Sequence, residues 1–65
     1  MAPILNSDER ELLKLIATHE VVAVPFWKPL TDGLEAKRLV VMDQHGVFRV
    51  TEYGAAVIGQ MRRLH

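Results

Sequence analysis

The stretch "GVFRVTEYGAAVIGQM", residues 46–61, passes from a short β-like run directly into a helical pattern. Thr51 is a good helix N-cap residue, and Glu52 follows it in the first turn, where the helix dipole favours negative charge. Gly54 stands three positions after that cap, although glycine costs a helix up to about 1 kcal/mol relative to alanine. Because glycine has no Cβ, it lets two backbones approach closely. We therefore expect Gly54 to pack the last helix tightly against the strand before it.

The residues on the N-terminal side of this stretch complete a β-hairpin. Its arms are Leu39 to Met42 and Val47 to Val50, and the four residues between them form the turn. Asp43 suits the first position of a type I turn, and Gly46 at the fourth position is expected to be left-handed and to make a bulge. The sequence thus predicts a hairpin over about 39–50. Both arms are apolar on both faces, so either another element or a partner must cover each side.

The N-terminal third predicts an amphipathic helix over about 7–18. Asn6 and Glu9 have the spacing of a capping box, and Asp8 and Glu9 lie in the first turn. One broad side carries the apolar residues of this segment, which are Leu12, Leu13, Leu15, Ile16 and Ala17.

The segment between this helix and the hairpin predicts a short strand and a second helix. Residues 21–24 are rich in β-branched side chains and stop at Pro25, which fits a third, edge strand or an extended link. A helix from about 27 to 37 tolerates Pro29 in its first turn. The order helix, strand, helix, hairpin, helix predicts an α+β fold with three helices and a small antiparallel sheet. We expect one domain over residues 1–65, since no repeat or linker divides the chain.

The segment "LEAKRLVVMDQHGVFRVTEYGAAVIGQM", residues 34–61, resembles the wing region of MarR-like and related bacterial winged-helix proteins. In those proteins an L-x-x-K-G-L-V pattern ends a helix, a hairpin follows, and L-T-x-x-G-R-x-x-L opens the next helix. The matching positions here are Leu34, Lys37, Leu39 and Val40 for the first pattern, and Thr51, Gly54 and Ile58 for the second. The resemblance covers under half of the chain and implies a winged-helix-like fold.

Two departures separate the sequence from that family. Arg38 occupies the position where the family usually has glycine, so a left-handed turn there would strain it by about 1 kcal/mol or more. Residues 19–38 have room for a short strand and one helix, whereas a full winged helix places a strand and two helices there. The expected fold is therefore a trimmed winged helix, with one helix of the helix-turn-helix missing.

Composition limits the classes of function. Hydrophobic residues make up 49% of the chain and charged residues 25%, and eight Lys and Arg balance eight Asp and Glu. A formal net charge of zero provides no long-range field to attract nucleic acid or an anionic membrane. The longest apolar runs are four residues, far short of the roughly 20 of a membrane span. The acidic N-terminus and the absence of Cys favour the cytoplasm.

Residues able to carry catalysis are few and scattered. His19, His45 and His65 fall at a helix end, at a turn and at the C-terminus, without the spacing of a metal site. Ser7 fits the start of a helix better than the role of a nucleophile. The four glycines form no phosphate-binding cluster. We therefore predict a protein that is not an enzyme and that uses no cofactor, metal or small-molecule ligand.

Two functional hypotheses remain. The first is a non-catalytic module that contacts another protein or a second copy of itself as a homodimer, because apolar strand residues outnumber those that three short helices can cover. The predicted interface residues are Val22, Val24, Trp27, Met42 and Phe48. The alternative is a small DNA-binding regulator of winged-helix type, in which cations clear of Asp32 and Glu35 contact phosphates. Its predicted contact residues are Lys28, Lys37, Arg38 and Arg49.

Overall fold

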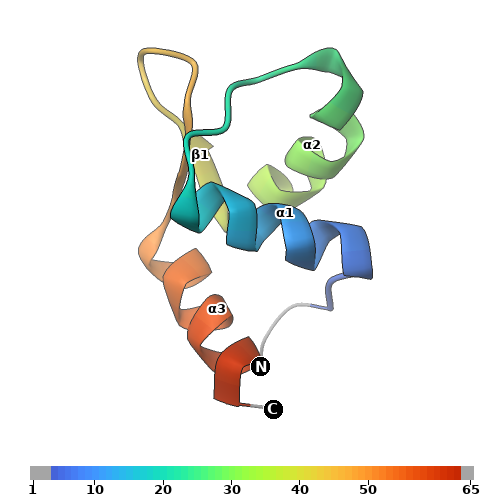
Figure 1. Ribbon diagram of the computed structural model, residues 1–65, viewed down its shortest axis with the longest axis vertical. Helices are drawn as coiled ribbons and strands as arrows, with labels where there is room; N and C mark the ends of the chain where they lie inside the picture. Colours follow the sequence, from blue (N-terminus) through green and yellow to red (C-terminus); the bar gives the residue numbers. More distant parts are fainter. Residues whose placement is uncertain (1–3, 64–65) are drawn as a thin grey trace.

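The computed structural model, which describes residues 4–63, consists of three helices and a short β-hairpin that lies at one side of the molecule (Figure 1). The elements in chain order are α1 (Ser7–Thr18), a 3-10 turn η1 (Pro25–Trp27), α2 (Lys28–Ala36), β1 (Val40–Met42), β2 (Phe48–Val50) and α3 (Glu52–Arg63). This arrangement confirms the predicted α+β class and is compatible with a small winged-helix-like fold. Between α1 and the hairpin the chain forms one α-helix, preceded by the single turn η1.

The sheet consists of β1 and β2, paired antiparallel with Val40 opposite Val50 and Met42 opposite Phe48. The predicted third strand over 21–24 is reduced to one antiparallel bridge, between Val22 and Val47. Two backbone hydrogen bonds flank this bridge, from Phe48 N–H to the Val21 carbonyl (2.9 Å) and from Ala23 N–H to the Gly46 carbonyl (3.2 Å). The pairing extends no further because the chain turns into η1 at Pro25, whose nitrogen has no hydrogen to donate.

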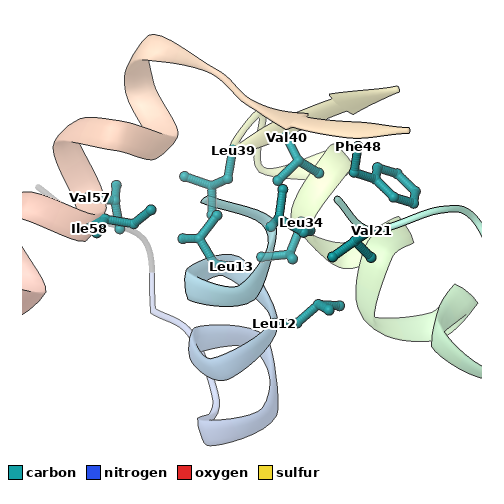
Figure 2. Packing of buried hydrophobic residues seen from close by; sticks show 10 residues of the cluster. Leu12, Leu13, Val21, Leu34, Leu39, Val40, Phe48, Val57 and Ile58 are labelled. Atoms are coloured by element: carbon teal, nitrogen blue, oxygen red, sulfur yellow. The ribbon is translucent and has the colours of Figure 1, made fainter. Parts of the chain in front are cut away.

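α1 lies at the centre of the fold and packs against α2, α3 and β2. Figure 2 shows Leu13 of α1 beside Leu34 of α2 and Leu39 of the turn before β1, and all three side chains are fully buried. Of the apolar side predicted for this helix, Leu12, Leu13 and Ile16 are buried, whereas Leu15 and Ala17 are exposed. One cluster joins all three helices and the hairpin, and its members are Leu12, Leu13, Ile16, Val21, Leu34, Leu39, Val40, Phe48, Val57 and Ile58.

Both predicted helix caps are confirmed. At α1, Glu9 N–H donates to Asn6 Oδ1 (2.8 Å) and Asn6 N–H donates to Glu9 Oε1 (3.2 Å), which completes the capping box. At α3, Gly54 N–H donates to Thr51 Oγ1 (2.9 Å). These bonds satisfy amide groups that have no partner within their own helix.

At Gly54, α3 approaches the hairpin closely. A Cβ built on Gly54 would overlap the carbonyl oxygen of Leu39 and would lie 2.8 Å from Val50 Cγ1. Thr51 N–H donates to that same Leu39 carbonyl (3.0 Å), so the start of α3 is tied to the chain entering β1. The packing role predicted for this glycine is confirmed.

Arg38 adopts the left-handed conformation, with φ of 62°, directly after α2. Leu39 N–H donates to the Leu34 carbonyl (3.0 Å) and Arg38 N–H donates to the Glu35 carbonyl (2.9 Å), the bond pattern of a Schellman helix end. The Thr51 hydroxyl donates to the Arg38 carbonyl (2.7 Å) and holds this turn in place. The arginine therefore bears the backbone strain that glycine would avoid.

Replacing Arg38 with glycine is expected to raise the free energy of unfolding by about 1 kcal/mol, because glycine adopts a positive φ without steric cost. A domain of this size should then melt about 4–8 °C higher, as followed by circular dichroism. Ala36→Gly is the matched control, because Ala36 has helical geometry two residues earlier and glycine there should lower stability by about 0.5–1 kcal/mol. Equal effects of the two glycines would contradict the role given to the left-handed turn.

Candidate interaction surface

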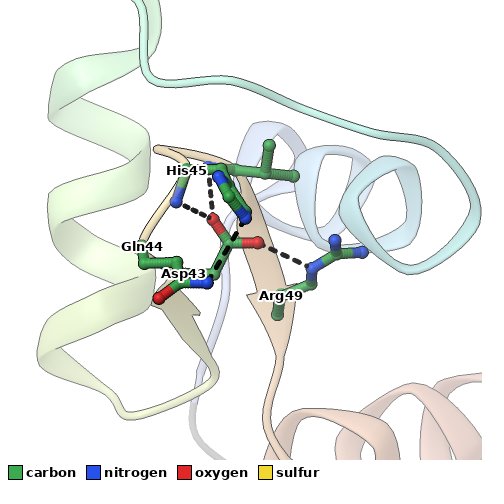
Figure 3. A network of polar contacts seen from close by, with 5 residues as sticks. Asp43, Gln44, His45 and Arg49 are labelled. Carbon is green, nitrogen blue, oxygen red and sulfur yellow. Dashed lines mark hydrogen bonds and ion pairs between the residues drawn. The ribbon is translucent and has the colours of Figure 1, made fainter.

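The hairpin turn is organised by Asp43, whose carboxylate accepts three hydrogen bonds (Figure 3). His45 N–H (2.8 Å) and Val47 N–H (3.0 Å) donate to Oδ1, and Arg49 Nε donates to Oδ2 (3.1 Å). The Val47 amide bond is the main reason that the pKa of Asp43 lies below its ordinary value, against the opposing effect of burial. Gly46 has a φ of 77°, which confirms its predicted left-handed conformation.

Three of the four cations predicted to contact phosphates form ion pairs within the protein. Arg49 is held by Asp43 at 3.1 Å, and Lys28 pairs with Asp32 one turn further along α2 at 3.2 Å. Lys37 reaches back to Glu9 of α1, with Nζ 2.9 Å from Oε2. Among residues 4–63, Arg38 is the one member of this set without an ion pair.

Of the five apolar residues predicted to form a protein interface, two are well exposed. Val22 is 52% exposed and Met42 is 45% exposed, while Val24 and Trp27 are half-buried. Phe48, which was also predicted to belong to this surface, is buried, with only 2% of it exposed. Phe48 lies on the same face of the sheet as Val40 and Val50, and this face packs against α1.

The sequence predictions did not name Val41 of the hairpin or Phe26 of η1, both of which are exposed apolar residues. Val41 is 51% exposed because it alternates with the buried Val40 and so lies on the opposite face of the sheet. That alternation was a readable signal. Phe26 is 83% exposed and meets the ring of Trp27 edge-on, with 5.2 Å between the ring centroids. No pattern in the sequence marks which of these two adjacent aromatic residues faces outward.

A groove of about 270 Å³ opens between α2, the segment before η1 and the end of the hairpin. Val24, Met42 and Phe48 contribute apolar surface to it, and the ion pair between Lys28 and Asp32 lies at its border. The full set of lining residues is Ala23, Val24, Pro25, Lys28, Thr31, Asp32, Glu35, Met42 and Phe48. The groove therefore joins three of the predicted interface residues to one of the predicted phosphate contacts.

The described side chains offer little to a metal-dependent or acid–base reaction. Within residues 4–63, no three His, Asp or Glu side chains are placed to share a metal ion. His65, which was considered as a ligand, lies outside the described residues. Thr31 is a buried polar residue, and its hydroxyl donates to the Lys28 carbonyl of its own helix (3.2 Å). The surface thus combines apolar side chains with charges, three of which, on Lys28, Lys37 and Arg49, are paired with carboxylates.

None of the described helices combines the length and the apolar character needed to cross a bilayer. No protein-family model matches the chain, and no match was found among curated proteins or among solved structures.

Proposed function

We propose that this chain is a non-catalytic binding module that acts through protein–protein contacts in the cytoplasm. The observation that carries the proposal is the exposure of apolar side chains on both faces of the sheet, each about half exposed in a domain of 65 residues: Val22 and Val41 lie on one face, and Met42 lies on the face of Phe48. Exposed apolar side chains gathered on a small domain are typical of interaction sites. Burying them against a partner gives roughly 25 cal/mol per Å² of apolar surface.

The arrangement of the charges supports a protein partner over nucleic acid. Lys28, Lys37 and Arg49 each lie 2.9–3.2 Å from a carboxylate, whose negative charge offsets much of their attraction for phosphates. Glu35 is also exposed on α2, and its charge would oppose a polyanion. The electrostatic attraction that supplies most of non-specific DNA binding is therefore weak on this surface.

A DNA-binding regulator of winged-helix type is the second candidate. The observation in its favour is the order of elements, since a helix precedes a hairpin whose second strand pairs with both β1 and the segment at Val22. In this reading, α2 would enter the major groove and the hairpin would flank it. Arg38, between α2 and β1, would be the cation available for a phosphate.

A salt titration of binding to mixed duplex DNA, followed by fluorescence anisotropy, separates the two candidates. The protein-contact proposal predicts no binding even at low salt, because three of the four cations expected at the DNA interface are paired with carboxylates and the net charge is zero. Micromolar binding that weakens steeply with salt, and that Arg38→Ala reduces, would instead support the regulator and overturn the proposal. Ala36→Gly serves as a control for changes in stability, since it alters the same helix end without removing a charge.

A further inference from the structure

The segment around Val22 presents an open backbone edge. Val21 C=O accepts from Phe48 N–H of β2, and Ala23 N–H donates to the Gly46 carbonyl. Because these groups alternate along a strand, the N–H and C=O of Val22 point away from the sheet. No residue in the described chain, 4–63, hydrogen-bonds to these two groups. The backbone is extended at both ends of the segment, with φ and ψ of −138° and 162° at His19 and of −129° and 146° at Val24. This is the geometry that an added strand requires.

We propose that a second copy of this chain adds to this edge as an antiparallel strand, with the two-fold axis at Val22. Each protomer's Val22 N–H would donate to the Val22 carbonyl of the other, and the two small sheets would become one. The inference rests on the proposed function, because it specifies the partner that the protein-contact surface takes.

Charge and backbone chemistry favour this register among the three in which the two-fold axis passes through a hydrogen-bonded pair of residues. Only Glu20, Val22 and Val24 have their backbone groups on the outer side, since these groups alternate along a strand. An axis at Glu20 would place two carboxylates on directly opposed residues, a repulsive pair. An axis at Val24 would use a carbonyl that already accepts from Trp27 N–H (3.1 Å), and Pro25 beside it has no N–H to offer. An axis at Val22 avoids both problems.

The Val22 register also explains why the partner is a copy of the same chain. Residues 21–25 are VVAVP, so Glu20 is the one charged residue among residues 20–25. In this register each Glu20 faces the uncharged Val24 of the other protomer. The two Glu20 residues are then about 13 Å apart along the strands, beyond the screening length of about 8 Å at physiological salt. A symmetric pair of these edges thus meets no like-charge contact.

The side chains on the outer face of the sheet fit the same pairing. Val22 lies opposite Val47 in its own protomer, and the new pair would set Val22 beside Val22, giving a continuous row of four valines across the dimer. Cross-strand pairs of β-branched residues are favourable in sheets. The row would also cover Val22, which is 52% exposed in one copy.

Disulfide trapping tests the register directly, because the sequence contains no Cys. In Val22→Cys the two thiols would lie on directly opposed residues, whose Cα atoms are about 5.5 Å apart in a hydrogen-bonded antiparallel pair. A disulfide spans this distance. Val41→Cys is the matched control, since Val41 is 51% exposed on the same face but belongs to the strand at the other edge.

We expect Val22→Cys to form covalent dimers roughly tenfold faster or more than Val41→Cys under mild oxidation, because pairing raises the effective thiol concentration. Equal rates would overturn the register.

Sedimentation of unmodified protein and of lysine variants completes the test. The wild type and Val41→Lys should be dimers, whereas Val22→Lys should be a folded monomer, since edge lysines block strand addition. A dimer that survives Val22→Lys, or a wild type that stays monomeric at all concentrations, would overturn the inference. A monomeric wild type that also fails to bind DNA would leave the proposed function standing with a different protein as partner. Salt-sensitive DNA binding would instead overturn the proposed function itself.

Discussion

Gly54→Ala is expected to lower the free energy of unfolding by about 3 kcal/mol or more. The added methyl group would overlap the carbonyl oxygen of Leu39, directly before β1, and crowd Val50 Cγ1 of β2. Overpacking of this kind typically costs about 1–3 kcal/mol, and more where the obstacle is backbone that cannot rotate away. The Leu39 carbonyl is fixed because it accepts from Thr51 N–H. A chain of this length has a total stability of about 3–10 kcal/mol, so the variant should be largely unfolded or melt far below the wild type.

Gly59→Ala provides the control within the same helix. A Cβ at Gly59 meets nothing within 4 Å, so alanine there should stabilise the protein by up to about 1 kcal/mol through its higher helix propensity. Urea denaturation of both variants, followed by circular dichroism at the helical signal, measures the contrast. If Gly54→Ala were as stable as Gly59→Ala, the close approach of α3 to the hairpin would be wrong.

The features that sequence predicted well are those determined by neighbouring residues. Asn6 with Glu9, Thr51 with Gly54, and the turn ending at Gly46 each depend on bonds between residues at most four positions apart. Such bonds follow from residue type and spacing alone. The helix bounds and the hairpin therefore agreed closely with the prediction.

The features that sequence missed depend on how distant segments meet. Phe48 was assigned to the surface because both arms of the hairpin are apolar, and only its backbone pairing with Val21 fixes which face of β2 is buried. A shift of one residue in that pairing would exchange the two faces. Lys37 was assigned to a phosphate, but its carboxylate partner is 28 residues earlier in the chain. No local pattern signals a contact of that separation.

The ion pair between Glu9 and Lys37 links the start of α1 to the end of α2. Glu9 is only 7% exposed, and its Oε2 lies 2.9 Å from Lys37 Nζ while its Oε1 accepts from Asn6 N–H. Gly33 makes room for the carboxylate, since a Cβ there would lie 2.7 Å from Oε2. One side chain thus caps its own helix and also fastens a second helix to it.

Glu9→Ala is expected to lower the free energy of unfolding by about 3 kcal/mol, because it removes both the capping bond and a charged hydrogen bond. Glu9→Gln is the matched variant, since the glutamine oxygen can still accept from Asn6 N–H, while its NH2 group would face the Lys37 ammonium and cannot accept from it. It should cost about 2 kcal/mol. Urea denaturation at pH 7 measures both. Equal losses from the two variants would show that the charge alone matters and that the capping bond contributes nothing.

Acid should remove the contribution of the charge. The hydrogen bond from Lys37 is the main cause that lowers the pKa of Glu9 from its ordinary 4.5, helped by the Asn6 N–H and opposed by burial. Because the folded pKa is the lower one, the stabilisation is fully present above the unfolded pKa and is lost as the pH falls through the folded value. The wild type should therefore lose more stability than Glu9→Gln between about pH 5 and pH 3, and the difference between them should shrink. A difference that stays constant over this range would mean that Glu9 titrates alike in the folded and unfolded chains, and that its pair with Lys37 adds no stability.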